Sequence, residues 1–240
     1  MRTDIGNALA SVADPGVSRE SLERLDGRVE EAHERIERGR ADDEFGYAAL
    51  NLPSETDPDA IREAVEPLSD SQAVLTVGIG GSALGAATIT SALEPSDVDH
   101  RVLDNVDPEH TRRVLAELPL AETAVNVVSR SGTTAETLAT FLVVRDAMVA
   151  AGVDWTERTI VTTGADGPLR DLVDEHGLPV LPVPEGVPGR FSALSAVGLV
   201  PAAIQGADID AILAGGARAA DSLAPSLFDC PAYAYGAVAY

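Results

Sequence analysis

The chain contains no lysine and only one cysteine. All 17 basic residues are therefore arginines, set against 39 aspartates and glutamates, and the formal net charge is -22. So acidic a surface repels nucleic acids and anionic membranes, which excludes both as expected partners. Because concentrated salt screens the self-repulsion of such a surface, the acidity and the lack of lysine together favour a salt-rich cytoplasm.

Long apolar segments are also lacking. Residues 1–13 include Arg2, Asp4 and Asn7 and build no apolar stretch of signal-peptide length, and no other segment has the apolar length that spans a bilayer. With Cys230 as the only cysteine, no intrachain disulfide can form. We therefore expect a soluble, cytoplasmic protein, and its 240 residues, 45% of them hydrophobic, are enough to bury a large core.

The first part of the chain has helical periodicity. From Ser18 to Arg40 the apolar positions fall on one helical face, which predicts one amphipathic helix with Ser18 as its N-cap. Asp57 followed by Pro58 is a second start signal, since an N-cap aspartate often precedes a proline in the first turn. Residues 1–68 are therefore predicted to be an N-terminal helical segment.

After Asp70 the pattern changes to short apolar runs separated by helix-length stretches. The runs are Ala73 to Val77, Val102 to Leu103, Ala124 to Val128, Thr159 to Thr162 and Val180 to Val183. Strands that are apolar on both faces and joined by helical crossovers form parallel sheets covered on both sides. The predicted fold class is α/β, a three-layer α/β/α domain with a mainly parallel sheet over residues 69–205.

Residues 206–240 are predicted to be the helical start of a second domain. Tyr233, Tyr235 and Val238 lie in what reads as the first turns of a helix, and no glycine, proline or basic last turn ends that helix before Tyr240. We interpret Tyr240 as a truncation point.

A glycine-rich turn, Gly78 to Gly85, follows the first predicted strand and opens a helix. Glycines let a backbone approach an anion closely, and the free N–H groups at a helix start are donors to phosphate. The segment also satisfies the dinucleotide fingerprint, with Asp104 near the end of the next strand in the position that holds a ribose. A Walker loop is excluded because it requires a lysine.

The third predicted strand ends in a second loop, Ser129 to Thr137, which is rich in hydroxyl groups. Ser129, Ser131 and Thr134 can each donate to a phosphate oxygen, and a turn at Gly132 is expected to expose backbone N–H groups as an anion nest. An ordinary helix N-cap needs only one hydroxyl, and a dinucleotide fold needs no second loop. The two loops are therefore predicted to lie side by side at the carboxyl edge of the sheet and to bind phosphate.

These two loops, together with the segment Gly189-Arg190-Phe191-Ser192 and the following Ser195 to Leu199, resemble the phosphoglucose isomerase family, which is built from sugar isomerase (SIS) domains. The resemblance implies a homodimer that interconverts glucose 6-phosphate and fructose 6-phosphate through an enediolate, without a cofactor or a metal. It places Arg190 beside the reacting carbons as the catalytic residue within this chain. The implied substrate-binding residues are Gly81, Ser82, Ser129, Arg130, Ser131, Thr134 and Glu136.

The chain departs from the family pattern at three points. Arg130 stands where the family usually has lysine, and Pro188 replaces a glycine before the catalytic arginine. The catalytic glutamate, the ring-opening histidine and a substrate lysine belong to later segments that are not found here. His33, His100, His110 and His176 are all interpreted as surface residues. A non-catalytic SIS-type phosphosugar sensor therefore stays the main alternative, with an NAD-binding oxidoreductase as a more distant one.

Overall fold

Five short parallel strands form the centre of the molecule. The computed structural model describes residues 4–93 and 96–239. The strands are β1 Ala73–Val77, β2 Asp99–Leu103, β3 Thr123–Ser129, β4 Thr159–Thr163 and β5 Val180–Pro182. Their order in the sheet is β2-β1-β3-β4-β5, and every neighbouring pair is parallel. The sequence prediction of a parallel sheet is confirmed.

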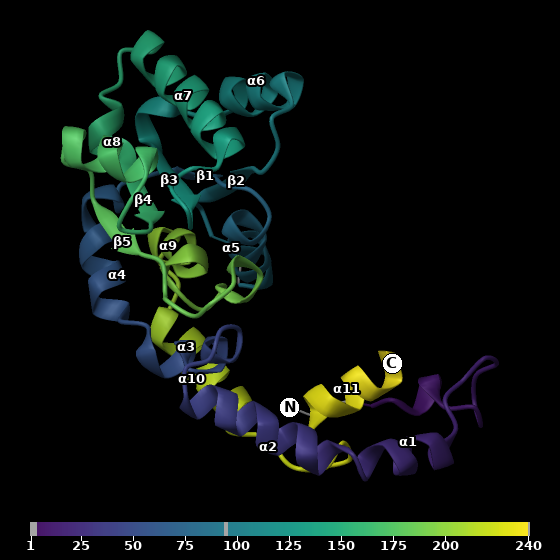
Figure 1. Ribbon diagram of the computed structural model, residues 1–240. Coiled ribbons are helices and arrows are strands. Elements are labelled where there is room, and N and C mark those ends of the chain that lie inside the picture. The colour runs from purple at the N-terminus through teal and green to yellow at the C-terminus, as the bar shows by residue number, and fades with distance from the viewer. Residues whose placement is uncertain (1–3, 94–95, 240) are drawn as a thin grey trace.

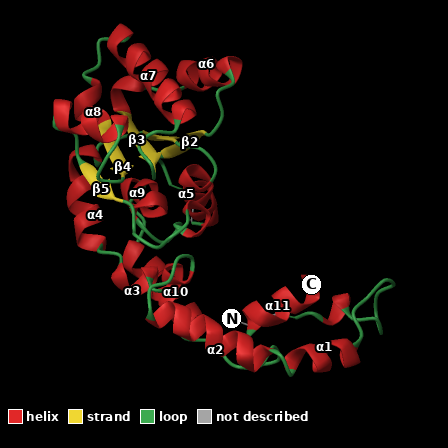
Figure 2. Ribbon diagram, viewed as in Figure 1, coloured by secondary structure: helices red, strands yellow, loops and turns green. Residues whose placement is uncertain are grey.

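Helices cover both faces of this sheet (Figures 1 and 2). One face is covered by α6 Pro108–Glu117, α7 Ala135–Ala150 and α8 Pro168–His176, and the other by α4 Pro58–Val65, α5 Gly81–Ala92 and α9 Ala196–Ile204. Short 3-10 turns connect the larger elements: η1 Gly6–Ala8, η2 Tyr47–Leu50, η3 Glu66–Leu68, η4 Leu120–Glu122, η5 Trp155–Arg158 and η6 Gly189–Phe191. The three-layer α/β/α architecture predicted from the sequence is therefore confirmed.

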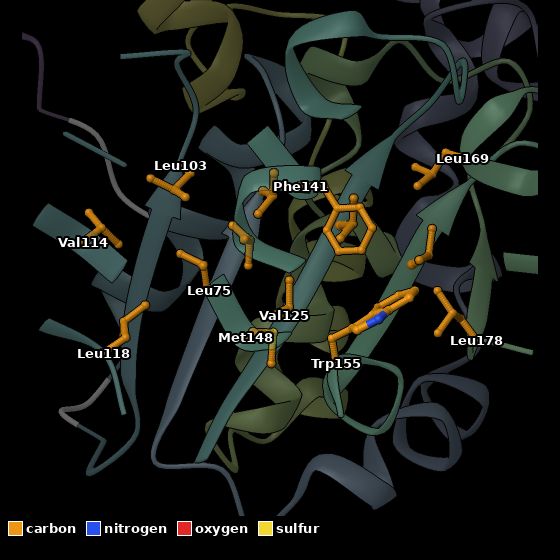
Figure 3. Packing of buried hydrophobic residues seen from close by; sticks show 14 of the residues in the cluster. Leu75, Leu103, Val114, Leu118, Val125, Phe141, Met148, Trp155, Leu169 and Leu178 are labelled. Carbon is orange, nitrogen blue, oxygen red and sulfur yellow. The ribbon is translucent and has the colours of Figure 1, made fainter. Parts of the chain in front are cut away.

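The core divides into two halves because successive strand residues point to opposite faces. In β1, Leu75 and Val77 pack toward α6, α7 and α8, whereas Val74 packs toward α4 and α9. Figure 3 shows the first half, where Phe141 and Trp155 meet edge to face with ring centroids 5.8 Å apart. Burial on both faces explains why the sequence of β1 is a continuous apolar run.

The two edges of the sheet differ in chemistry. On the outer strand β2, Arg101 pairs with Asp99 of the same strand at 2.6 Å and with Glu117 of α6 at 3.7 Å. On the opposite edge, β5 ends in Pro182 and is flanked by Pro179 and Pro184.

The predicted single helix from Ser18 to Arg40 is wrong, because the structure has two helices there. They are α1 Arg19–Asp26 and α2 Val29–Ala41, with Gly27 and Arg28 between them. Gly27 is a poor helix former, and the amides of Gly27 and Arg28 both bond to the carbonyl of Leu25 in a tight turn. The predicted caps are confirmed, since the Ser18 side chain accepts from the Ser21 amide and Asp57 accepts from the amides of Asp59 and Ala60.

The helices α1, α2 and α11 extend away from the sheet as an arm (Figure 1). Helix α11 spans Pro231–Ala239, and α3 Leu52–Glu55 and α10 Ile209–Ala220 connect the arm to the sheet region. The arm is held by His33, which hydrogen-bonds the Tyr233 hydroxyl at 2.9 Å, and by Asp26, which accepts from the Leu227 amide at 2.7 Å. The start of a helix after residue 230 is confirmed, whereas the domain limits stay predictions.

His100 is not the surface residue that the sequence suggested. It lies on β2, half-buried between the sheet and α5, with Nε2 2.9 Å from Thr76 Oγ1 and Nδ1 2.8 Å from Thr90 Oγ1. Burial lowers the pKa of His100 from 6.5 to about 4.

Across the described ranges 4–93 and 96–239, no helix combines the length and apolarity needed to cross a membrane.

Candidate functional site

The site lies where the direction of sheet winding reverses. From β1 the chain first crosses to β2 on one side and then returns to β3 on the other, so β1 and β3 are neighbours in the sheet. Val77 at the end of β1 is paired with Val127 near the end of β3. In open α/β sheets ligands bind at this kind of reversal, outside the carboxyl ends of the strands. The predicted adjacency of the two loops is confirmed.

The first loop reaches its helix through a conformation that favours glycine. Gly80, the N-cap of α5, has φ of 56°. The amides of Ser82 and Ala83 bond back to the carbonyls of Ile79 and Gly80. The Gly81 amide opens α5 and has no partner within its own helix, so it is available to a ligand.

Gly78 allows the first loop to lie against the end of β3. A Cβ atom at Gly78 would be 2.9 Å from Cβ of Ser82 and 3.0 Å from the carbonyl oxygen of Val128. Val128 immediately precedes Ser129. The absence of a side chain at Gly78 therefore brings Ser82 close to the start of the hydroxyl loop.

Three hydroxyl groups of the second loop form a cluster. The buried Ser129 donates from Oγ to Oγ1 of Thr134 at 3.2 Å, and Oγ of Ser131 lies 3.5 Å from the same Oγ1. Thr134 is the N-cap of α7, yet its side chain makes no capping hydrogen bond. Since a helix cap would use that hydroxyl locally, its position beside two serines indicates a different use.

The predicted nest of free amides around Gly132 is wrong for two of its amides. The Gly132 N–H donates to the carbonyl of Ser129 at 3.2 Å, and the Thr133 N–H donates to Oγ of Ser131 at 3.2 Å. Gly132 itself has φ of 64°, the left-handed conformation that the turn requires. The hydroxyls and the start of α7, rather than these amides, are the donors that the loop presents.

The third segment, around Arg190, packs on the first loop. A Cβ atom at Gly81 would be 2.3 Å from the carbonyl carbon of Gly189 and 2.5 Å from the nitrogen of Arg190, which means that the two backbones touch. Ser192 fixes the turn by donating from Oγ to the Gly189 carbonyl at 2.7 Å. Ser195 in turn donates to the Ser192 carbonyl at 2.7 Å and caps α9.

Two arginines at the site have no acidic partner. Most described arginines pair with carboxylates, as Arg62 does with Asp59 and Asp210, whereas Arg130 and Arg190 are among the few described arginines that form no ion pair. In so acidic a chain, a guanidinium without a carboxylate is a ready anion partner. Arg190 is exposed, and its Cζ lies 4.7 Å from the centre of the Phe191 ring.

The remaining predicted residues lie near the hydroxyl loop. Glu136 is exposed in the first turn of α7. Arg130 extends toward the N-terminal segment, with Cζ 5.5 Å from the centre of the Phe45 ring. The structure thus brings Gly81, Ser82 and Arg190 together on one side, and Ser129, Ser131 and Thr134 on the adjacent strand end.

Sequence reasoning missed two residues that shape the site. Phe45 meets Arg130 from a segment more than 80 residues earlier, and no motif marked it. Thr163 at the end of β4 donates to the carbonyl of Ser129 at 2.8 Å and so fixes the base of the hydroxyl loop. The only sequence signal for Thr163 was its position at the end of a predicted strand.

The described part of the chain contains no group of three or more metal-ligating side chains.

Comparison with known proteins matches this geometry to one family. A family model described as Phosphoglucose isomerase matches residues 67–226. A protein named "Probable glucose-6-phosphate isomerase" from Haloarcula marismortui is 68% identical over 240 residues, which is 100% of this chain and 55% of the relative. A glucose-6-phosphate isomerase from Thermus thermophilus is 41% identical over 215 residues, covering 86% of this chain and 51% of the relative.

Solved structures agree with the sequence comparison. A hypothetical protein from Thermus thermophilus superposes with a TM-score of 0.77 at 40% identity, covering 86% of this chain and 51% of that one. A glucose-6-phosphate isomerase from Chlamydia trachomatis has a TM-score of 0.78 at 23% identity, covering 93% and 50%, and shows the fold alone. The chain spans about half the length of the curated relatives it matches.

Proposed function

The chain belongs to the phosphoglucose isomerase family, and on that premise we propose that it forms the phosphate-binding half of the active site of an aldose-ketose isomerase. The substrates are glucose 6-phosphate and fructose 6-phosphate. The observation that carries the proposal is the meeting of three segments at one sheet edge: the glycine turn after β1, the hydroxyl loop after β3 and the Arg190 turn on Gly81.

The hydroxyl groups of Ser82, Ser129, Ser131 and Thr134 would hold the phosphate. Each is a donor, and the starts of α5 and α7 add partial positive charge from their helix dipoles. Gripping the phosphate orients the distant reacting carbons and reduces the entropy cost of reaching the transition state.

Arg190 would act at the other end of the sugar. Isomerisation removes a proton beside the carbonyl and returns it to the neighbouring carbon, with an enediolate between the two steps. A guanidinium stabilises the developing oxyanion and keeps its own charge throughout. The base, the ring-opening histidine and a substrate lysine belong, by family resemblance, to segments outside these 240 residues.

We extend the proposal to the oligomeric state and the cellular location, which are supported by the family resemblance and by the charge. The working protein would be a homodimer in the cytoplasm. The net charge of -22 and the absence of lysine favour a cytoplasm with a high salt concentration. Nucleic acids and membranes are not proposed as partners, because the surface charge repels both.

The test compares this chain with a version extended to the length of its relatives. In a host lacking its own isomerase, the extended protein should convert fructose 6-phosphate to glucose 6-phosphate, and the 240-residue chain should bind the sugar phosphate without turnover. An extended protein that binds the sugar phosphate but never isomerises it would support the sensor. Saturable NAD binding with no hexose phosphate binding would support the oxidoreductase.

A further inference from the structure

A cavity lies beside the hydroxyl loop, at the carboxyl edge of β4 and β5. Its volume is about 420 Å³, within the usual range for small-molecule sites. The lining residues that carry its chemistry are Arg130, Arg170, Gly164, Pro182, Pro184 and Glu185. None of these except Arg130 belongs to the three segments described above.

Both arginines have unused donors. Arg130 forms no ion pair with any described residue and is supported from one side by Phe45. Arg170, in the first turn of α8, donates from Nε to Asp174 Oδ1 at 3.0 Å, and its terminal nitrogens form no hydrogen bond with residues 4–93 or 96–239. A guanidinium carries five N–H donors, so the terminal nitrogens of Arg170 are left for a ligand.

From this arrangement we propose that the cavity binds the phosphate group of a second small phosphorylated ligand. Two guanidinium groups suit a phosphate, since arginine recognises phosphate oxygens in bidentate fashion. The proline wall would contact the body of the ligand, and Glu185 at the rim would accept a hydrogen bond from a hydroxyl group on it. This inference does not depend on the proposed isomerase activity.

The cavity is linked physically to the hydroxyl loop. Thr163, which lines the cavity, donates to the Ser129 carbonyl at 2.8 Å. The Leu169 amide at the start of α8 donates to the Gly132 carbonyl at 3.1 Å. Arg130 lies between the two sites. The two sites are therefore neighbours, and we expect the coupling between them, which is reciprocal, to change either affinity by less than about twofold.

The experiment is a titration of the 240-residue protein with inorganic phosphate, followed by backbone amide NMR at constant ionic strength. The amides of Gly164 and Ala165 report on the cavity, and those of Ser131 and Thr134 report on the hydroxyl loop. Arg170→Gln should weaken the binding reported by Gly164 and Ala165 by about tenfold, the scale of one charge-assisted contact, and change the hydroxyl-loop affinity by less than about twofold.

Three further variants complete the test. Thr134→Val should show the reverse pattern, weakening only the hydroxyl-loop binding. Glu185→Gln removes a negative charge from the rim and should tighten cavity binding by about twofold or more. Arg145→Gln, which removes an arginine paired with Asp146 on α7, is the matched control and should leave both sites unchanged.

The proposal is overturned if Gly164 and Ala165 do not respond to phosphate, or if Arg145→Gln weakens the cavity binding as much as Arg170→Gln does. It also fails if Arg170→Gln weakens both sets of amides equally, because the cavity would then be part of one site. Should Arg170→Gln fold poorly, Glu185→Gln still decides, since unchanged or weaker binding contradicts the proposal.

Discussion

A Cβ atom on Gly81 would lie 2.5 Å from the backbone nitrogen of Arg190. No side chain fits between these two residues, so the first turn of α5 sets the position of the Arg190 turn by direct backbone contact. The proposed catalytic arginine is therefore placed by a glycine more than 100 residues earlier in the chain.

Gly81→Ala should displace the Arg190 turn and destabilise the fold by about 1–3 kcal/mol, the usual cost of overpacking. Gly215→Ala is the matched control, because the nearest atom to its new Cβ is the Arg218 side chain at 3.7 Å and alanine is favoured within α10. Urea denaturation measures both. Equal free energies of unfolding for the two variants would mean that the Arg190 turn can move away from residue 81 without loss of stability.

Thr134→Val removes one proposed phosphate donor at nearly constant volume. In the extended enzyme it should raise KM by about tenfold or more, the effect of losing roughly one hydrogen bond to a charged group, with a smaller fall in kcat. Thr88→Val on the exposed side of α5 serves as the control, because it removes a hydroxyl whose one hydrogen bond to the described residues is to the Leu84 carbonyl of its own helix. Unchanged KM in Thr134→Val would leave that hydroxyl without a role in binding.

Arg190→Ala should act on kcat instead. Loss of a positioned charge facing the enediolate is expected to cost about 3 kcal/mol, or roughly a hundredfold in rate, by analogy with oxyanion-hole deletions. Steady-state kinetics of the extended enzyme measure this, with circular dichroism confirming the fold. A correctly folded variant with the parent kcat would make Arg190 a structural residue of its turn.

The fold and the site were predictable to different extents. Four strands and both loops were found because local signals mark them, namely apolar runs, glycines before a helix and clustered hydroxyls. Only the last two residues of β2 Asp99–Leu103 were predicted, because its first residues are polar and charged and form no apolar run. The break at Gly27 was missed because the apolar periodicity continues across it and a single glycine does not by itself end a helix. The turn hydrogen bonds of Gly27 and Arg28 to the Leu25 carbonyl show the break in the structure. The Phe45 contact and the burial of His100 depend on tertiary packing between distant segments, for which a single sequence carries no local signal.

His100 should make stability depend on pH in a window above the range of the carboxylates. The Thr90 hydroxyl also lies 3.0 Å from the Ala86 carbonyl and donates to it, so the neutral ring donates from Nδ1 to Thr90 and accepts at Nε2 from Thr76. Burial lowers the folded-state pKa from 6.5 to about 4. Between these values the unfolded chain binds a proton that the folded chain does not, so stability falls as the pH is lowered.

The expected loss from pH 6.5 to pH 4 is at most about 3 kcal/mol, at about 1.4 kcal/mol per pH unit. Urea denaturation at stepwise pH measures it. His100→Gln should flatten this part of the curve, and His110→Gln on the surface helix α6 should not. The acidic groups Asp70, Asp107 and Asp154, whose pKa values are lowered by hydrogen bonds, act below this window. A slope that persists in His100→Gln would assign the pH dependence to other groups.

Salt should stabilise the chain, because the net charge of -22 produces self-repulsion that ions screen. The Tm should rise from dilute buffer to molar potassium chloride. A parallel series in sucrose separates charge screening from a general effect of crowded solvent, since sucrose leaves the repulsion intact. A Tm that stays flat or falls in potassium chloride would contradict salt adaptation.

The two edges of the sheet bear on how the chain behaves when it is crowded. An unpaired outer strand is a template on which another molecule can extend the sheet, the first step of many aggregates. Here β2 presents the charged residues Asp99 and Arg101, which resist a second strand, and β5 is bracketed by prolines that have no amide to offer. Neither edge is therefore suited to pairing with a strand of another molecule. In concentrated salt, where the repulsion between acidic surfaces is screened, these edges still oppose aggregation.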